Sequence, residues 1–360
     1  MNAVAADTLD FELPDALSAS EPPEARGIGR DGVRLMATRA ADDSVVHTSF
    51  RSLGDHLSAG DVLVVNSSAT VNAAFDARIE DGRGAGSHVV VHLSAPIGED
   101  RWAIELRRLA AIGRGTEPLP DARAGSAIRL RGGAIAVLLG PFAQRGGPGA
   151  GVRLWTAHLS IGEMHEYARR WGRPIRYSYV PLTWPIEYYQ TVFADEPGSA
   201  EMPSAGRAFT REMVRDLERR GVQFVSVLLH AGVASAEVDE PPAPERFHVD
   251  SRAAADVNDA RSKGGRVIAV GTTVVRALES TGNGEGRVQP GAGWTDHVVG
   301  PDQPVRTVDG LLTGFHAPRA SHLAMLESIA TRQHLEVAYG EALRRGYLWH
   351  EFGDLHLILR

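Results

Sequence analysis

The sequence predicts an α/β fold, in which a main domain with a mixed or largely parallel sheet and helices carries an inserted small antiparallel β-barrel. Short apolar segments alternate with helical segments over residues 210–280, which indicates parallel strands joined by right-handed crossovers. Short strands separated by glycine-rich turns fill residues 72–158, which is typical of a small all-β module. Because this module interrupts the α/β pattern, we expect residues 1–71 and 159–360 to form one discontinuous main domain around the barrel at 72–158.

The main domain is expected to begin with an irregular arm followed by two strands. Pro14 favours an extended or turn-like backbone in the residues before it. Strands are expected over residues 33–38 and 61–66. The second of these is a run of Val and Leu that ends at Asn66, and such a run is the composition of a buried strand.

The inserted barrel is predicted from alternating apolar and polar residues and from glycine-rich turns. The expected elements are strands over residues 89–93 and 102–106, a hairpin formed by residues 127–130 and 135–139 around Gly132-Gly133, and a loop over residues 145–149.

Helices and strands alternate again after the barrel. The expected elements are a helix over 163–171 ended by Gly172, a helix over 210–220 capped by Thr210, a strand over 222–229, a helix capped by Asp250 or Ser251, a strand over 266–270, helices over 321–331 and 334–345, and a closing strand over 355–359. The two middle strands lead into His230 and Gly271. Because parallel strands end at the same edge of a sheet, we expect His230 and Gly271 to lie on one edge.

The turn from the strand at 266–270 into the next helix is the strongest candidate for a ligand site. Gly271 is followed by Thr272 and Thr273, and a threonine hydroxyl there could cap the helix and leave backbone N–H groups pointing outward. Open α/β sheets bind ligands at such edges. Arg276 and Glu279 lie three residues apart and could pair. An ordinary strand-to-helix turn with a surface ion pair explains the same residues.

The composition excludes several kinds of chemistry. The 360 residues include no cysteine, which excludes disulfides, thiolate catalysis and cysteine-ligated zinc, and the histidines show no His-Glu-x-x-His spacing. The composition therefore gives no signal of a zincin-type or cysteine-ligated metal site. The net charge of −7 disfavours a strong nonspecific grip on nucleic acid, although a local basic patch could still bind it. With no apolar run of ~20 residues and an acidic N-terminus, we expect a cytoplasmic protein without a membrane partner. We also expect a monomer.

Motifs spread over almost the whole chain resemble one known family. They lie at residues 11–14, 60–66, 189–194, 203–210, 270–279, 308–318 and 352–354. In this order they closely resemble the blocks of the S-adenosylmethionine:tRNA ribosyltransferase-isomerases of the queuosine pathway. The resemblance implies an α/β domain with an inserted β-barrel, S-adenosylmethionine as co-substrate, tRNA as partner and no metal.

The resemblance also implies a reaction. The ribosyl part of S-adenosylmethionine is transferred to a 7-aminomethyl-7-deazaguanine base in tRNA and isomerised, which gives epoxyqueuosine and releases adenine and methionine. The sulfonium acidifies the C5′ hydrogens, so the site needs a base with a pKa near the working pH and a proton donor for the departing adenine. It must also exclude water from the reactive intermediate.

The chain departs from the family pattern at several charged positions. The family's Asn-Asp-Thr-Arg-Val is Asn66-Ser67-Ser68-Ala69-Thr70 here, and its Leu-His is Arg207-Ala208. These losses suggest an alternative, in which a diverged member uses the same sulfonium chemistry on a small-molecule acceptor or simply cleaves S-adenosylmethionine. A third possibility is a nucleotide- or RNA-binding protein that has lost catalysis.

Three residues are candidates for catalysis. His230 is the leading base or adenine contact, because histidine titrates in the useful pH range, although a histidine in the protein core would look the same. His316 is the next candidate, and it could instead anchor its loop. Asp309 could orient a sugar hydroxyl or a histidine, or could cap the turn at Asp309-Gly310.

The remaining candidates would bind S-adenosylmethionine. Arg276 and Glu279 could contact the carboxylate and amine of its methionine part. Tyr189 could stack on a base, although core packing is a commoner use of such an aromatic ring. The full predicted set of cofactor-binding residues is Asn66, Tyr189, Gln190, Gly271, Thr272, Thr273, Arg276 and Glu279.

Overall fold

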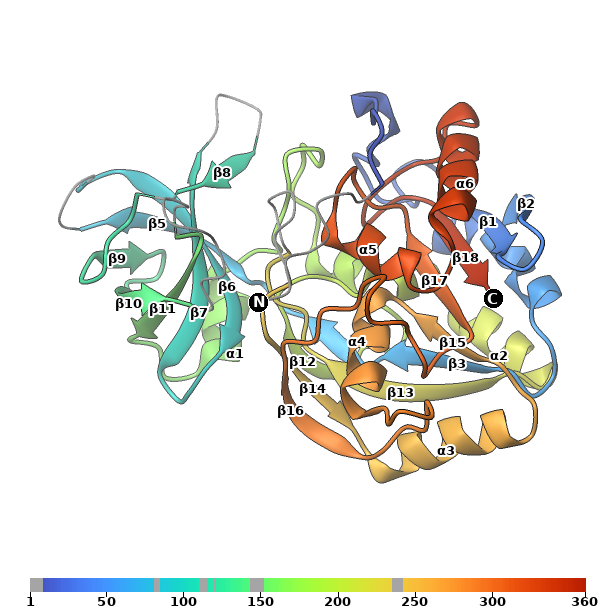
Figure 1. Cartoon of the computed structure of the whole chain (residues 1–360). Helices are drawn as coiled ribbons and strands as arrows, with labels where there is room; N and C mark the ends of the chain where they lie inside the picture. Colours follow the sequence, from blue (N-terminus) through green and yellow to red (C-terminus); the bar gives the residue numbers. More distant parts are fainter. Residues whose placement is uncertain (1–8, 81–84, 110–114, 120, 143–151, 235–241) are drawn as a thin grey trace.

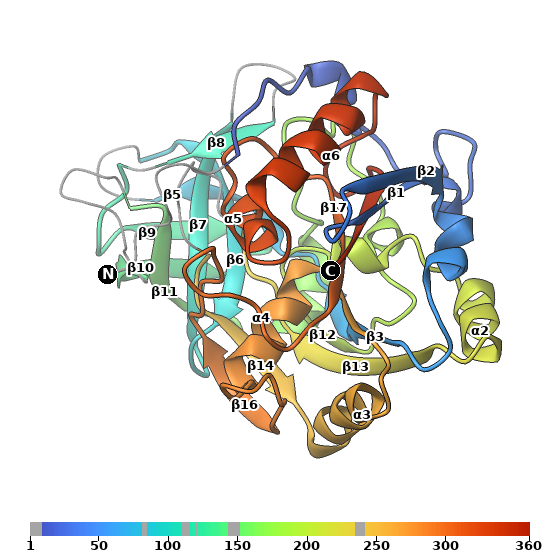
Figure 2. The ribbon, with the colours of Figure 1, turned by 45° about the vertical axis from the view of Figure 1, so that its right-hand side comes forward.

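The structure of the protein, a computed structural model, describes residues 9–80, 85–109, 115–119, 121–142, 152–234 and 242–360. It has a larger α/β body and a smaller β body that lie side by side (Figure 1). After a rotation of 45° the smaller body is still seen beside the larger one (Figure 2). Among the described residues, no helix is both long enough and apolar enough to span a membrane.

The larger body is built on a mixed sheet. Within the described residues this sheet has nine strands in the order β16 (Gly291–Thr295), β14 (Glu245–Val249), β13 (Gln223–Leu229), β3 (Val62–Asn66), β15 (Val267–Val270), β17 (Gly310–Gly314), β18 (Leu355–Leu359), β1 (Arg34–Arg39) and β2 (Ser44–Ser49). Strands β13, β3, β15 and β17 are parallel, and so are β18 and β1, while the other pairs are antiparallel. This arrangement confirms the predicted mixed sheet.

Helices cover both faces of this sheet. Helices α3, α4, α5 and α6 supply buried residues to one hydrophobic core, and α2 and the 3-10 helix η3 supply them to the core on the other face. Their bounds are α2 (Arg211–Arg219), α3 (Ser251–Ser262), α4 (Thr272–Thr281), α5 (Ser321–Glu327), α6 (Arg332–Arg344) and η3 (Phe50–His56), and the shorter 3-10 helices are η1 (Asp15–Leu17), η2 (Arg30–Gly32), η4 (Ile186–Tyr189) and η5 (Ser204–Gly206).

The smaller body is a closed antiparallel barrel. Its strands are β5 (Ala74–Ile79), β6 (His88–Pro96), β7 (Arg101–Leu109), β9 (Ala127–Leu130), β10 (Ile135–Pro141) and β11 (Leu154–Leu159), with β8 (Thr116–Pro118) paired to β7. The pairing of β11 with β7 closes the barrel, and α1 (Met164–Trp171) follows β11. The predicted inserted barrel is thus confirmed. The predicted boundaries at residues 72 and 158 lie near the ends of β5 and β11 and remain a proposal.

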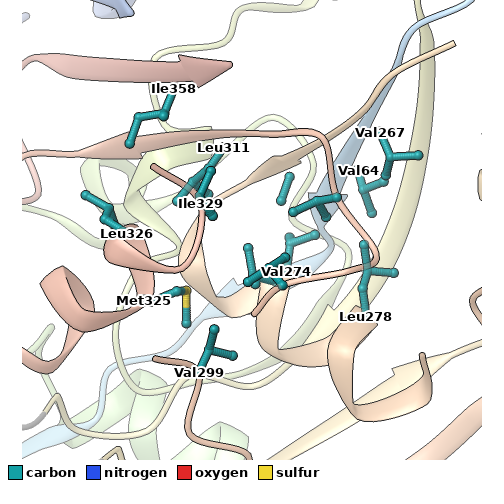
Figure 3. Packing of buried hydrophobic residues seen from close by; sticks show 14 of the residues in the cluster. Val64, Val267, Val274, Leu278, Val299, Leu311, Met325, Leu326, Ile329 and Ile358 are labelled. Atoms are coloured by element: carbon teal, nitrogen blue, oxygen red, sulfur yellow. The ribbon is translucent and has the colours of Figure 1, made fainter. Parts of the chain in front are cut away.

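Strand β3 explains why the sheet needs cover on both faces. Val64 belongs to the core under α4, and Leu63 belongs to the core under α2. Both side chains have no exposed surface, and burying each contributes roughly 1.5–3 kcal/mol. In Figure 3, Val274 and Leu278 of α4 lie on the same side of the sheet as Val64. This packing fixes the position of α4, which begins at the predicted ligand edge.

The predicted N-caps of α2 and α3 are confirmed, whereas the bounds of α5 and α6 differ from the prediction. Thr210 accepts a hydrogen bond from Met213 N at 3.1 Å, and Asp250 accepts one from Ala253 N at 2.7 Å. Thr331, in contrast, caps α6, so α5 ends before the predicted residue 331 and α6 begins before the predicted residue 334. The predicted loop over residues 145–149 lies outside the described residues.

Candidate active site

The carboxyl ends of the parallel strands meet at one edge of the large sheet. Strands β13 and β15 both pair in parallel with β3, so His230 and Gly271 lie at this edge as predicted. Gly271 adopts φ 98°, a backbone conformation that favours glycine, and it is the N-cap of α4. The predicted threonine cap is wrong, because no side chain caps this helix. The hydroxyl groups of Thr272 and Thr273 are therefore not used as caps.

Asn66 holds the end of β13 and the residues after β3 in place at this edge through hydrogen bonds to their backbone. Its Nδ2 donates to the backbone oxygen of Leu229 at 2.8 Å, and its Oδ1 accepts from Leu229 N at 3.1 Å and from Ser68 N at 3.0 Å. Nδ2 also lies 3.4 Å from Thr273 Oγ1. Asn66 is buried and lies outside the cavity lining described next, so we assign it a positioning role.

A cavity of about 310 Å³ opens at this edge. It is lined by the start of α4, the segment after β13, residues 200–205, the end of β17 with the start of α5, and residues 350–351. Of the predicted site residues, the lining includes Tyr189, Gly271, Thr272, Thr273, Arg276 and His316. It does not include Asn66, Gln190, His230, Glu279 or Asp309. The structure therefore brings together about half of the predicted site.

His230 lies beside the cavity and is held by side chains. Its Nδ1 is 2.8 Å from Ser68 Oγ, which is 2.7 Å from Ser199 Oγ, and its Nε2 is 3.6 Å from Glu196 Oε1. Burial lowers the pKa of His230 below its usual value. The residues that follow it, starting at Ala231, line the cavity. His230 thus shapes the wall, and its ring is engaged on both sides.

His316 lies in the cavity wall. Its Nε2 is 2.8 Å from Thr313 Oγ1, and its ring stacks on His322 with centroids 4.7 Å apart. Burial, together with the neighbouring histidines, lowers the pKa of His316 well below its usual value. Burial also lowers the pKa of His322 to about 4. Both rings are therefore neutral near pH 7, and a neutral imidazole can accept a proton.

Asp309 and Glu279 lie away from the cavity, which corrects two predictions. Asp309 precedes β17, at the amino ends of the strands, where its Oδ2 accepts from Val267 N at 2.8 Å. The cavity is at the carboxyl ends. Glu279 Oε1 accepts from Thr307 N at 2.7 Å and from Thr307 Oγ1 at 2.5 Å, so it fixes the segment before β17. Both carboxylates have structural partners and we do not carry them into the proposed site.

The predicted Arg276–Glu279 pair is also wrong. The Arg276 guanidinium is buried and pairs with Glu245. Its remaining donors reach the backbone oxygens of His297 at 3.2 Å and Thr295 at 3.2 Å. Because these contacts engage all three guanidinium nitrogens and pair the charge with Glu245, Arg276 orders the cavity wall, and we do not assign it to a carboxylate of the ligand.

Tyr189 and Gln190 have different roles. The Tyr189 ring packs against Phe352 with centroids 5.2 Å apart, and its buried hydroxyl has no hydrogen-bond partner in the described structure. Gln190 lies outside the cavity and makes two hydrogen bonds to the backbone of Thr70. Its Oε1 accepts from Thr70 N at 3.1 Å, and its Nε2 donates to Thr70 O at 2.8 Å. This contact holds β4 (Ser68–Thr70), which pairs with β12 (Glu196–Ser199), under the cavity.

Several polar residues of the cavity were not predicted. Tyr177 donates to Glu201 Oε1, which also accepts from Ala234 N at 2.7 Å. Tyr179 donates to Glu351 Oε2 at 2.6 Å. Burial raises the pKa of Glu201 to about 7, and it raises that of Glu351 as well. The two tyrosines at alternating positions were the only local signal for this cluster.

These features define an α/β protein with an inserted barrel and a small-molecule cavity at the carboxyl ends of its parallel strands. Among the described residues, no group of three or more potential ligands lies close enough to hold a metal ion. Residues 6–358 match the family model described as queuosine biosynthesis protein. The chain belongs to this family.

Named relatives cover nearly the whole chain. The S-adenosylmethionine:tRNA ribosyltransferase-isomerase of Heliobacterium modesticaldum is 36% identical over 97% of this chain and 98% of its own length. The protein of the same name from Symbiobacterium thermophilum is 35% identical over 98% of both chains. The crystal structure of S-adenosylmethionine tRNA ribosyltransferase from Thermotoga maritima matches with a TM-score of 0.53 and 26% identity, covering 98% of this chain and 99% of that one.

Proposed function

We propose that this chain is an S-adenosylmethionine:tRNA ribosyltransferase-isomerase. It transfers and isomerises the ribosyl part of S-adenosylmethionine onto a 7-aminomethyl-7-deazaguanine base in tRNA and releases adenine and methionine. The observation that carries this proposal is full-length similarity to relatives of that name, at 36% and 35% identity. The same proposal places the protein in the cytoplasm, with tRNA, as a monomer.

The charge of the cavity suits S-adenosylmethionine, which carries a sulfonium cation. Among the described lining residues there are three glutamates, Glu201, Glu245 and Glu351, and one arginine. Arg276 neutralises Glu245, so two carboxylates are left to face a positive ligand. The volume also lies in the range of small-molecule sites.

The start of α4 suits the one negative group of S-adenosylmethionine. The first N–H groups of a helix have no partner within the helix, and the helix dipole makes this end positive. Thr272 and Thr273 line the cavity there, and their hydroxyls do not cap the helix. We assign the methionine carboxylate to this end, where backbone N–H groups and hydroxyls can donate to it.

Of the two candidate histidines, we assign proton transfer to His316, because it lines the cavity and His230 does not. Burial lowers the pKa of His316 well below its usual value, so the ring is present as the free base but is a weaker base than an unperturbed histidine. The sulfonium acidifies the C5′ hydrogens, and the neutral imidazole takes one of them while the electron pair stays on C5′ beside the positive sulfur. The electron pair on C5′ then opens the sugar, the bond between C1′ and adenine breaks, and the imidazolium can donate its proton to the departing adenine. On this assignment, His316→Gln lowers kcat at least 100-fold and changes the KM for S-adenosylmethionine little.

The decisive assay is adenine release from S-adenosylmethionine by the pure protein. We expect release only with tRNA that bears the aminomethyl-deazaguanine base, and none with the same tRNA carrying guanine. Release at the same rate without tRNA would contradict the assigned acceptor and support cleavage or a small-molecule acceptor. Absence of release under all three conditions would contradict the proposed reaction itself.

A further inference from the structure

Two glutamate–tyrosine pairs stand side by side in the cavity wall. Tyr177 donates to Glu201, and Tyr179 donates to Glu351. The two tyrosine rings stack with centroids 5.9 Å apart and an interplanar angle of 24°. This stack holds the two carboxylates in fixed positions, and each tyrosine engages one oxygen of its glutamate. In the described structure the other oxygen of each has no side-chain donor.

Among the residues that the structure describes, neither of these carboxylates has a counter-cation within ion-pair distance. Within the described residues, no ion pair is formed by Glu201 or by Glu351, whereas the third glutamate of the cavity pairs with Arg276. Burial is the largest cause of the raised pKa of Glu201, and the negative charge of Glu351 raises this pKa further. Two neighbouring carboxylates without a cation are costly to keep charged in a partly buried wall.

The hydroxyl of Tyr189 gives an independent indication of a ligand. Tyr189 lines the same cavity, is only 4% exposed, and its hydroxyl has no hydrogen-bond partner in the described structure. Glu351 lines the same cavity, and its charge acts on this hydroxyl, as do the opposing charges of Arg176 and Arg207. Buried hydroxyls are nearly always hydrogen-bonded, and one that lacks a protein partner in a cavity wall is available to a ligand group.

We propose that Glu201, Glu351 and Tyr189 form a subsite that binds a primary ammonium group of a substrate. An ammonium group has three N–H donors, and the subsite offers two carboxylate oxygens and one phenol oxygen as acceptors. A sulfonium has no N–H group and would leave the phenol without a partner. The subsite binds the cation without a covalent step.

This inference rests on the proposed function for the source of the ammonium group. Two groups of the substrates have this chemistry: the aminomethyl group of the deazaguanine base, and the amino group in the methionine part of S-adenosylmethionine. Glu201→Gln and Glu351→Gln test the subsite, because each removes a charge and keeps an acceptor for the tyrosine, and matched amine probes distinguish the two sources.

The test measures binding by calorimetry to wild type, Glu201→Gln and Glu351→Gln. Two matched probe pairs are used: free 7-aminomethyl-7-deazaguanine with its 7-cyano analogue, and S-adenosylmethionine with the analogue in which a carbonyl replaces the amino group. We expect each variant to weaken binding of one amine probe roughly 10- to 100-fold, as the loss of a charge-assisted hydrogen bond requires. Its amine-free partner should bind within about twofold of wild type.

If the variants bind 7-aminomethyl-7-deazaguanine more weakly, the subsite binds the aminomethyl group of the acceptor base. If they bind S-adenosylmethionine more weakly, the subsite binds the amino group of its methionine part. Unchanged binding of both amines in both variants overturns the proposal. Tyr189→Phe, which removes only the hydroxyl, should weaken the same amine roughly 2- to 10-fold. Glu187→Gln, an exposed glutamate outside the cavity lining, is the matched control and should change neither probe pair.

The outcome is separable from that of the proposed function. If wild type releases no adenine with modified tRNA while the variants still bind an amine probe more weakly than wild type does, the proposed reaction is wrong and the ammonium subsite is supported. If adenine release depends on modified tRNA but the variants bind both amines as wild type does, only the subsite fails.

Discussion

The barrel and the cavity both bury glutamates, but they compensate the charge differently. Glu105 in the barrel has no exposed surface and accepts from Arg107 at 2.8 Å, Arg153 at 3.1 Å and His92 at 3.2 Å. Burial alone would raise the pKa of Glu105, but these partners lower it to about 2. In the cavity, burial raises the pKa of Glu201 to about 7, because only neutral donors contact it.

This difference separates a carboxylate that stabilises the fold from one that serves a ligand. The charge of Glu105 is compensated by side chains of the protein itself, so this carboxylate does not require a ligand. Glu201 has a perturbed pKa and a position in a cavity, and this combination is characteristic of functional sites. The protein therefore gives up some stability at the cavity, which a bound cation would restore.

The largest expected effect is on the barrel side of this comparison. Glu105→Gln removes the carboxylate that pairs with the buried guanidinium of Arg107, and we expect a loss of roughly 3–5 kcal/mol in the free energy of unfolding, measured with urea. The exposed pair Arg108–Glu117 provides the control, and Glu117→Gln should cost less than about 1 kcal/mol. Equal losses in the two variants would refute the structural role assigned to Glu105.

The next effect concerns the pH dependence of amine binding in the cavity. A cation binds best to ionised Glu201, whose pKa is about 7, so affinity should fall roughly tenfold per pH unit well below pH 7. The groups that face this carboxyl are Tyr177, the Ala234 N–H and the charges of Glu351 and Glu105. Calorimetry between pH 5.5 and 8 measures how the affinity for the amine depends on pH. If the same dependence persists in Glu201→Gln, a group other than Glu201 causes it.

The smallest expected effect is a gain in stability. The folded pKa of Glu201 lies above its ordinary value of 4.5, so this carboxyl lowers stability progressively as the pH rises from about 4.5 through 7. Glu201→Gln should therefore raise the Tm by roughly 1–3 °C at pH 8 and by less at pH 5. A variant that is less stable than wild type at pH 8 would mean that Glu201 already has a favourable partner.

Local signals in the sequence predicted the fold well. Period-two alternation identified the barrel strands, and the apolar runs before His230 and Gly271 identified two neighbours of β3. Asp309 was misplaced although a signal existed, because a residue that precedes a strand lies at its amino end and not at the ligand edge. Pairing of Arg276 with Glu279 failed because an i,i+3 pair contributes only about 0.2–0.5 kcal/mol, less than the buried pair with Glu245.

The acidic part of the cavity could not be predicted from one sequence. Tyr179 and Glu351 are 172 residues apart, and Tyr177 and Glu201 are 24 apart, so no spacing rule connects them. Both tyrosines lie in the segment before η4, whereas Glu201 lies between β12 and η5 and Glu351 lies between α6 and β18. The orphan hydroxyl of Tyr189 is likewise a property of packing and is invisible in a residue pattern.

The central claim is that S-adenosylmethionine occupies the cavity at the start of α4. A crystal structure of the complex tests it most directly. Our account predicts the methionine carboxylate at the N–H groups of Thr272 and Thr273 and the ribose next to His316. A nucleoside bound in the barrel, or at the amino ends of the strands near Asp309, would contradict it.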